Sequence, residues 1–321
     1  MPVLTSSAPG KIILSGEHAV VYGHPAIAFP VPQVRVQAFI AARPTAPQEE
    51  IQVISDLVHL NSPLASLKPH HPIRLAVEIV KQELRLEHLP AFELRIASTI
   101  PVGSGLGSSA ATAVAVVRAV SGFLGAILPD QTISDLAFRV EKQIHGSPSG
   151  IDNTVTAFNH PVYFVRGEPI LALKVPVPLA FVIGDTGISS STRAVVDDVR
   201  RMRDENPTRV DAILQKIGAL TREMRVAMET GRLEQLGALI NANHNLLAEL
   251  EVSSPQLERL VAAARAAGAQ GAKLSGSGRG GNMIAYCLPQ DIQKVEHALL
   301  QAGAAHTIRF TYQPEDAGHA D

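Results

Sequence analysis

A glycine-serine loop between a strand pattern and a helix pattern constrains the fold of this chain most. The loop spans residues 101–110 and has a glycine at every second position from Gly103 to Gly107. Before it, residues 92–96 alternate apolar and polar side chains, as a half-buried strand does. After it, residues 110–120 are almost all Ala and Val, which is typical of a buried helix. The sequence therefore predicts a strand, a glycine loop and a helix in succession.

Such a loop can hold a phosphate group. Glycine has no Cβ, so the backbone can come close to a ligand, and the following helix directs free N–H groups and a positive dipole end at the loop. Ser108 and Ser109 add hydroxyl groups at the helix start. The alternative is a glycine-rich turn capped by serine. The loop is not a Walker A motif, because no Lys follows the glycines, and its third glycine falls one position early for a dinucleotide fingerprint.

Composition excludes several classes of function. The 321 residues include 4% aromatic residues and no Trp, and the net charge is -2, which argues against a surface that binds nucleic acid or an anionic membrane. No apolar run approaches transmembrane length. The N-terminal residues show no export signal, so we expect a cytoplasmic protein. The single Cys287 lies in an apolar run and is predicted to be a core residue.

The pattern of elements predicts an α+β protein in two lobes, with residues 1–168 in the first and 169–321 in the second. Helices are expected at residues 73–86, 133–144, 193–205, 210–230, 233–250, 255–267 and 292–302, and strands at 11–14, 26–29, 34–41, 271–274, 282–287 and 307–312. Thr132 is predicted to cap the second of these helices, and Gly146 to end it. Residues 44–71 lack a strong period and are interpreted as a mobile excursion or lid.

Three polar residues near glycine turns have the chemistry of a phosphotransferase. Such an enzyme needs an oxygen ligand for Mg²⁺, a carboxylate near the acceptor hydroxyl, and a cation near the transferred phosphate. Glu141 can be the ligand, Asp152 the base and Lys11 the cation, and His145 shares a helix face with Glu141. Taken singly, each acid is more often a surface residue, and the glycine loop alone supports a phosphate site and a simple turn about equally. The alternatives for the other two glycine segments are a solvated turn for residues 8–21 and a long hairpin loop for residues 273–282.

Several segments, in order along the chain, resemble the signature motifs of the GHMP kinases. They are residues 9–18, with Gly16-Glu17-His18; residues 101–110; and residues 274–278. Residues 144–153 and 243–247 most resemble the mevalonate kinases of this family. The resemblance covers residues 7–310 and implies a first lobe like ribosomal protein S5 domain 2 and a ferredoxin-like second lobe. It also implies ATP and Mg²⁺ as cofactors.

The resemblance assigns roles position by position. Ser109 and Glu141 correspond to the residues linked to Mg²⁺, Asp152 to the catalytic aspartate, and Lys11 to the lysine beside it. The residues predicted to bind ATP are Pro101, Gly103, Ser104, Gly105, Leu106, Gly107, Ser108 and Ser109. The residues predicted to bind or organise the substrate are Glu17, His18, Thr192 and Gly276.

The cation that meets a substrate carboxylate is left open. Some family members carry Arg two residues before the threonine that corresponds to Thr192. This chain has Ser190 at that position, and Arg193 comes directly after Thr192. Lys273 and Arg279 are the other cations near the motifs.

The implied reaction is the phosphorylation of (R)-mevalonate by ATP, with a homodimer as the expected assembly. Phosphomevalonate kinase, another small-alcohol kinase of this fold, and a sensor that binds ATP without catalysis are the alternatives, because fold alone does not establish activity. Retention of Lys11, Glu141 and Asp152 together argues against the sensor.

Overall fold

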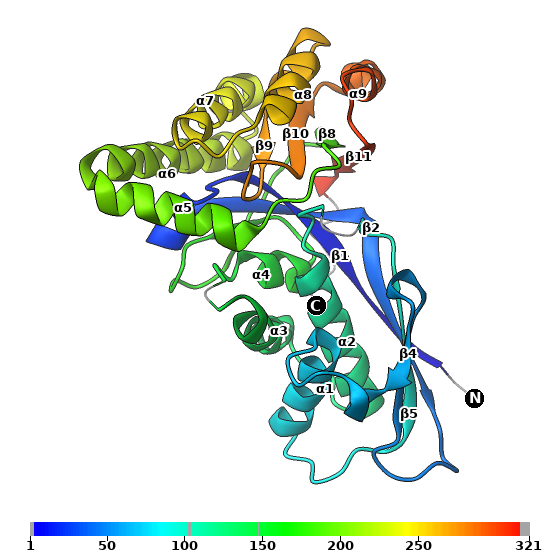
Figure 1. Cartoon of the computed structure of the whole chain (residues 1–321). Coiled ribbons are helices and arrows are strands. Elements are labelled where there is room, and N and C mark those ends of the chain that lie inside the picture. The colour runs from blue at the N-terminus through cyan, green and yellow to red at the C-terminus, as the bar shows by residue number, and fades with distance from the viewer. Residues whose placement is uncertain (1–2, 102–103, 147, 315–321) are drawn as a thin grey trace. The chain divides into compact units, whose positions relative to one another are not determined.

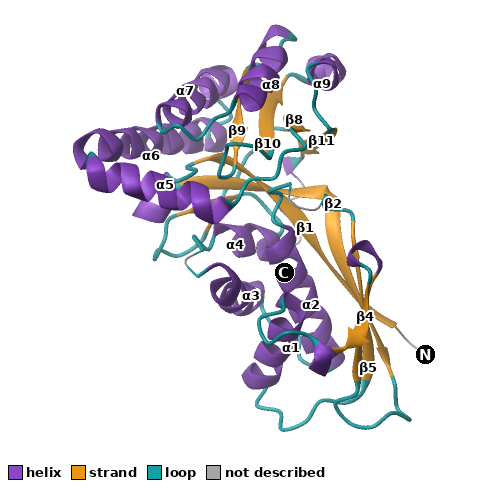
Figure 2. Cartoon of the chain, viewed as in Figure 1, coloured by secondary structure: helices purple, strands orange, loops and turns teal. Residues whose placement is uncertain are grey.

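The computed structural model describes residues 3–101, 104–146 and 148–314 (Figure 1). The chain forms two compact units that interleave along the sequence. Unit 1 comprises residues 1–10, 34–101 and 107–159, and unit 2 comprises residues 11–33, 102–106 and 160–321. The mixture of helices and strands agrees with the α+β prediction (Figure 2). The predicted lobe boundary after residue 168 stays a prediction.

Four helices form the helical part of unit 1. They are α1 (Pro72–Glu83), α2 (Ser108–Phe123), α3 (Asp130–His145) and α4 (Ile151–Phe158). Helix α2 packs against the other three, and α3 packs against α1 and α4. The Ala and Val side chains of α2 are nearly all buried because neighbours surround the helix on several sides.

The strands of the larger sheet follow the order β4-β3-β5-β2-β6-β7, with β1 paired to β2. Their bounds are β1 (Val3–Ser15), β2 (Ala26–Ala42), β3 (Ile51–Ser55), β4 (Leu60–Pro63), β5 (Phe92–Ser98), β6 (Val162–Phe164) and β7 (Leu171–Ala172). Strand β3 pairs with β5 in parallel, whereas β2 pairs with β5 and with β6 antiparallel. Because β5 leads into the glycine loop and α2, the predicted strand, loop and helix are confirmed.

Unit 2 contains a four-stranded antiparallel sheet of order β11-β8-β10-β9. Its strands are β8 (Leu179–Asp185), β9 (Gly271–Ser275), β10 (Asn282–Cys287) and β11 (His306–Tyr312). Helices α8 (Pro255–Ala266) and α9 (Ile292–Gln301) pack on this sheet. Helix α7 (Leu236–Glu249) packs on β9 and on α6 (Pro207–Glu229), which also contacts α5 (Thr192–Glu205). Short 3₁₀ helices occur at η1 (Ala19–Tyr22), η2 (Asp56–Val58), η3 (Leu64–Ser66), η4 (Leu233–Gln235) and η5 (Pro289–Asp291).

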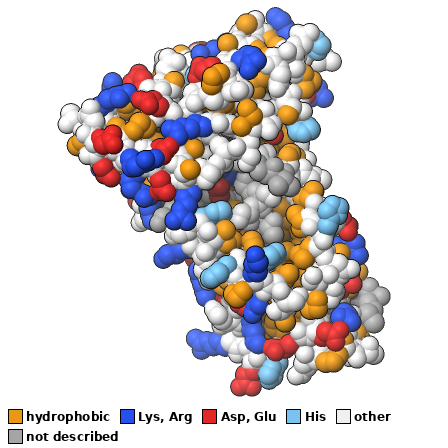
Figure 3. Space-filling model, in the orientation of Figure 1, with side chains coloured by type: hydrophobic (Ala, Val, Ile, Leu, Met, Phe, Trp, Pro, Cys, Tyr) orange, Lys and Arg blue, Asp and Glu red, His pale blue; other side chains and the backbone are white. Residues whose placement is uncertain are grey.

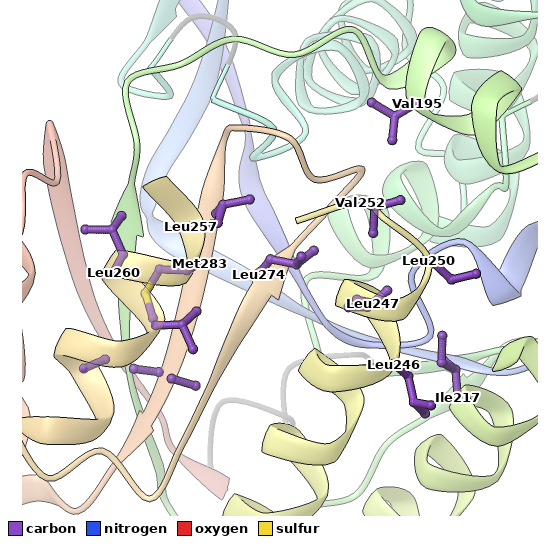
Figure 4. Packing of buried hydrophobic residues seen from close by; sticks show 14 of the residues in the cluster. Val195, Ile217, Leu246, Leu247, Leu250, Val252, Leu257, Leu260, Leu274 and Met283 are labelled. Atoms are coloured by element: carbon purple, nitrogen blue, oxygen red, sulfur yellow. The ribbon is translucent and has the colours of Figure 1, made fainter. Parts of the chain in front are cut away.

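A hydrophobic core joins the sheet and the helices of unit 2 (Figure 4). Leu274 of β9 and Met283 of β10 meet Leu257 and Leu260 of α8, and Leu247 of α7 belongs to the same cluster. Each fully buried side chain of this size contributes about 1.5–3 kcal/mol relative to an exposed one. This packing makes β9 a firm support for the glycine loop that follows it. Cys287 is 1% exposed and belongs to this core, as predicted.

Three sequence expectations are wrong. Residues 44–71 contain the paired strands β3 and β4, where an excursion without regular strands was expected. Apart from residues 51–54 the sequence has no strong period there, since strands of four or five residues are too short to show one. A role as a lid near the nucleotide stays a prediction. Thr132 does not cap α3, which begins at Asp130 after Pro129, although Gly146 ends it as predicted. Residues 26–29 and 34–41 belong to one continuous strand, β2. In addition, α4 and the strands β6, β7 and β8 were not predicted from the sequence.

Within residues 3–101, 104–146 and 148–314, no helix combines the length and the apolarity needed to cross a bilayer.

Candidate active site

The glycine loop leads into the amino end of α2, which no side chain caps. Gly105 and Gly107 have φ angles of 77° and 76°, in the left-handed region that favours glycine. Gly107 is the N-cap of α2 and supplies no side-chain hydrogen bond to the first turn. The backbone N–H groups there are therefore suited to an anion, in the manner of a phosphate site. Pro101 is half-buried, and Gly103 lies outside the described residues.

Ser109 and Glu141 meet in unit 1, although they are 32 positions apart. The Ser109 hydroxyl donates to Glu141 Oε1 at 2.5 Å, and the Glu141 residue is only 5% exposed. His145 Nε2 lies 3.7 Å from Glu141 Oε2. The two residues that the resemblance links to Mg²⁺ therefore lie in contact, and their role as metal ligands stays a prediction.

This pair fits a hard divalent cation only as part of a larger set of ligands. Carboxylate and hydroxyl oxygens suit Mg²⁺, which commonly completes its octahedron with waters and substrate phosphates. The described residues contain no cluster of three or more His, Cys, Asp or Glu side chains that could hold a metal alone. The donor set thus matches a metal that is bound together with a nucleotide.

Asp152 occupies the first turn of α4 in unit 1. Gly150, with a φ angle of 95°, precedes the helix, and the neighbouring Asn153 donates from Nδ2 to the Ser134 carbonyl and hydroxyl at 3.0 and 2.9 Å. The start of α4 is therefore fixed to α3, and Asp152 is half-buried at its amino end. A helix amino terminus is a favourable place for a negatively charged side chain.

Lys11 and the first part of the glycine loop lie together in unit 2. The Lys11 backbone N–H donates to the Leu106 carbonyl at 2.9 Å, and Lys11 is 4% exposed. Asn282, at the start of β10, donates from its side-chain amide to the Ser104 carbonyl. The first glycine-rich segment and the strand after the third one therefore both contact residues 104–106.

The substrate candidates of unit 2 cluster around Ser277. His18 Nε2 lies 3.0 Å from the Ser277 carbonyl, and Thr192 Oγ1 lies 3.4 Å from Ser277 Oγ. Burial lowers the pKa of His18 to about 4, against the opposing effect of its bond to Ser277, so the ring is neutral at pH 7. Gly276 has a φ angle of 90° and open space where a Cβ would point.

Glu17, the remaining substrate candidate, is 2% exposed and forms an ion pair with Lys273. Burial raises the pKa of Glu17, and the Lys273 ammonium opposes that shift. Both groups lie in the interior, so the Lys273 ammonium contacts the Glu17 carboxylate and is shielded from solvent.

The other cations of unit 2 near the third glycine loop differ in their partners. Arg279 pairs with Asp198, whereas Arg193 is 84% exposed and lies 3.9 Å from Asp197. Figure 3 shows basic and acidic groups intermixed over α5 and α6 on the face in view, in line with the Arg–Asp pairs there. This side of unit 2 presents no single-sign basic patch for a highly charged ligand.

The structure divides the predicted residues between the units. Unit 1 holds Gly107, Ser108, Ser109, Glu141 and Asp152, and unit 2 holds Lys11, Glu17, His18, Ser104, Gly105, Leu106, Thr192 and Gly276. Sequence reasoning missed Asn153, Ser275 and Asn282 as supports of these residues. Each is a polar residue in an otherwise apolar strand or at the start of a helix. This pattern could have indicated a supporting role, because a buried polar group needs a hydrogen-bond partner.

Comparison with known proteins identifies two family models along the chain. The model described as "GHMP kinases N terminal domain" matches residues 71–160, and that described as "GHMP kinases C terminal" matches residues 224–305. A mevalonate kinase of Thermococcus gammatolerans is 38% identical over 327 residues, which cover 94% of each chain.

Solved structures of the same fold agree. A crystal structure of L. major mevalonate kinase in complex with R-mevalonate has a TM-score of 0.82 and 30% identity, and covers 97% of this chain and 96% of that one. A Streptococcus pneumoniae phosphomevalonate kinase, in complex with phosphomevalonate and AMPPNP, has the same TM-score of 0.82 but 20% identity, with 97% and 100% covered. The second likeness shows the fold alone. The predicted α+β fold with two such domains is confirmed.

Proposed function

Because the chain belongs to the GHMP kinase family, we propose that it transfers the γ-phosphoryl group of ATP to the terminal hydroxyl of (R)-mevalonate. The products are 5-phosphomevalonate and ADP. The observation that carries this proposal is the 38% identity to a mevalonate kinase along 94% of both chains. Kinases of this family use ATP as the phosphate donor, and the uncapped start of α2 suits its phosphates.

Asp152 is proposed to accept the proton of the attacking hydroxyl. The hydroxyl oxygen forms a bond to the γ-phosphorus while the bond from that phosphorus to the β-bridging oxygen breaks, and ADP leaves. Asp152 lies in the first turn of α4, and its proposed contribution is orientation of the hydroxyl and negative charge. Lys11, in unit 2, is proposed to stabilise the negative charge that develops during the transfer.

Ser109 and Glu141 are proposed to hold Mg²⁺ together with the phosphates of ATP. The short contact between their oxygens and the burial of Glu141 support this role. Mg²⁺ supplies charge neutralisation to the transferred phosphate when bound. Residues 101–109 are proposed to contact the triphosphate, and Glu17, His18, Thr192 and Gly276 to bind or organise the alcohol. We also propose a cytoplasmic homodimer with its lobes divided after residue 168.

Phosphomevalonate is the strongest alternative acceptor. Its additional dianionic phosphate requires Arg or Lys side chains that are free to bind it. In the described part of unit 2, Lys273 is paired with Glu17 and Arg279 with Asp198. The exposed Arg193 suits a single carboxylate better than a carboxylate and a phosphate together, which favours mevalonate.

A coupled ADP-release assay with mevalonate, 5-phosphomevalonate, homoserine and galactose tests the proposal. We expect ATP turnover with mevalonate, and 5-phosphomevalonate as the product by mass spectrometry. Absence of ADP release with every alcohol, combined with normal ATP binding, would favour a non-catalytic sensor. Turnover with homoserine or galactose alone would assign the chain to another acceptor class.

A further inference from the structure

Lys273 and Glu17 form a buried ion pair that joins the first and third glycine-rich segments of unit 2. The side chains are 0% and 1% exposed. Lys273 Nζ also donates to the Leu274 carbonyl at 2.6 Å. Glu17 Oε2 is buried and has no hydrogen-bond partner among the described residues. The charge of Glu17 is therefore compensated by nearby cations, first of all Lys273.

Further hydrogen bonds tie the same two segments together. Ser275 Oγ donates to the Ile13 carbonyl at 2.8 Å and lies 3.1 Å from the Ile13 N–H. His18 Nε2 contacts the Ser277 carbonyl at 3.0 Å. The turn that carries Glu17 and His18 thus rests on β9 and on the loop after it.

This turn needs outside support because its backbone is strained. His18 has a φ angle of 60° and a ψ angle of -46°, a sparsely populated combination that costs a non-glycine residue on the order of 1–3 kcal/mol. Gly16 has a φ angle of 97°, and a Cβ there would lie 2.4 Å from the Pro25 carbonyl oxygen. Strained conformations persist only where surrounding contacts fix them.

Strand β9 provides a rigid base for Lys273. Two side chains of α7 contact the backbone at its outer edge: Asn241 Oδ1 accepts from the Ala272 N–H at 3.0 Å, and His244 Nδ1 accepts from the Leu274 N–H at 3.2 Å. On its other side, β9 pairs with β10. The lysine therefore projects from a strand that is held on both edges.

We propose, on the basis of the proposed kinase function, that Lys273 is a positioning residue for the alcohol substrate. By neutralising Glu17 in the interior, it holds the Gly16–His18 turn in the conformation that presents His18 to the acceptor. Lys11 also acts electrostatically on Glu17, so two lysines share one buried carboxylate. Without Lys273, that carboxylate attracts Lys11 alone, and Lys11 is then drawn away from the transferred phosphate that it is proposed to stabilise.

The test compares Lys273→Met, the double variant Glu17→Gln/Lys273→Met, and the control Arg309→Met. Arg309 lies on β11 of the same sheet and pairs with Glu296 at the surface, with its side chain 54% exposed. Each protein is assayed for thermal unfolding and for the KM of acceptor and of ATP between pH 6 and 9.

In Lys273→Met we expect the acceptor KM to rise by about 10- to 100-fold while the ATP KM stays within about twofold. A buried carboxyl without its cation titrates near neutrality, so this KM should increase further with pH. The double variant has no such carboxyl, and its raised KM should be independent of pH. Arg309→Met should match the wild type.

Two results would overturn the proposal. One is a Lys273→Met protein whose unfolding temperature is lowered but whose acceptor KM and pH profile equal those of the wild type. Lys273 would then stabilise the fold without positioning the substrate. The other is a wild-type acceptor KM in the double variant Glu17→Gln/Lys273→Met. This result remains decisive if Lys273→Met does not fold, because the double variant contains no unpaired buried charge. If the wild type itself phosphorylates no mevalonate, the proposed function fails, and the comparison is made with the alcohol that it does use.

Discussion

Asp152 is the side chain on which the proposed chemistry depends most. Asp152→Asn keeps the shape of the group but removes its charge and its ability to accept a proton. We expect kcat to fall by roughly 10²–10⁴-fold, the range for loss of general-base assistance, with ATP binding retained in equilibrium titration.

Asp135→Asn is the matched control for this substitution. Asp135 is an exposed carboxylate of α3 in the same unit, and its Oδ1 accepts a hydrogen bond from the Gln131 side-chain amide at 2.9 Å. It should retain wild-type turnover. Near-normal turnover in Asp152→Asn would remove this residue from the catalytic role.

Glu141 and Ser109 make a graded prediction about the metal. Glu141→Gln replaces a charged oxygen ligand with a neutral one, so activity should fall and the Mg²⁺ concentration for half-maximal rate should rise. Ser109→Ala should act in the same direction but more weakly, because a hydroxyl is a neutral ligand. Titration of Mg²⁺ at fixed ATP measures both. An unchanged Mg²⁺ requirement in both variants, equal to that of the exposed-site control Glu78→Gln, would contradict the assignment.

His18 predicts a specific acid sensitivity. Its pKa is lowered from 6.5 to about 4 by burial, so the unfolded chain binds the proton more readily than the folded one. Stability from the neutral ring is present above pH 6.5 and is lost as the pH falls toward 4. We expect the wild type to lose about 2–3 kcal/mol more than His18→Asn between pH 7 and 4.5, because Asn tolerates a positive φ but does not titrate. Urea unfolding at both pH values measures this difference; equal losses in the two proteins would contradict it.

The glycine loop and α2 act as one device, since the loop conformation determines where the helix N–H groups point. Gly105→Val introduces a β-branched side chain at a φ angle of 77° and beside the Asn282 amide, 3.8 Å from the new Cβ. We expect ATP affinity to fall by at least about tenfold in a protein that still folds. Gly125→Val, at a φ angle of 81° beyond the other end of α2 with open space around it, carries the same strain and should keep its ATP affinity. Equal ATP affinities in the two variants would argue against a phosphate site at the glycine loop.

The elements that sequence predicted best are the ones with long periodic patterns. Helices α5 to α9 were located to within a few residues, because each has several turns of apolar spacing. In contrast, β8 is an almost fully buried run that follows a Pro-containing segment, and it shows no alternation of apolar and polar residues. Helix α4 spans only Ile151–Phe158, too short for its period to be recognised.

Pairings between distant segments could not be predicted from local patterns. Ser109 and Glu141 were brought together only through the resemblance to a family. Lys273 was noted as a cation near the motifs, yet its partner Glu17 is 256 positions away. Whether a lysine meets solvent, substrate or a buried carboxylate depends on how strands assemble, and the sequence pattern around Lys273 contains no such information.

Substrate choice joins these observations into one claim about the molecule. The fold is shared with mevalonate and phosphomevalonate kinases at equal TM-scores of 0.82, so the overall fold does not separate the two reactions. The distinction rests on charge: the interior cation Lys273 is neutralised by Glu17, and Arg279 by Asp198. Among the described residues of unit 2, few cations are therefore available to bind the phosphate group of 5-phosphomevalonate.

The most direct measurement of this claim is a competition between the two acceptors. Isotopically labelled mevalonate and unlabelled 5-phosphomevalonate are supplied at equal concentrations with ATP and Mg²⁺, and mass spectrometry follows the labelled monophosphate and the unlabelled diphosphate. The ratio of initial rates equals the ratio of the two kcat/KM values. The account predicts that labelled 5-phosphomevalonate forms at least about 100-fold faster, the discrimination that one unpaired charged group of about 3 kcal/mol provides. Faster formation of the diphosphate would contradict it.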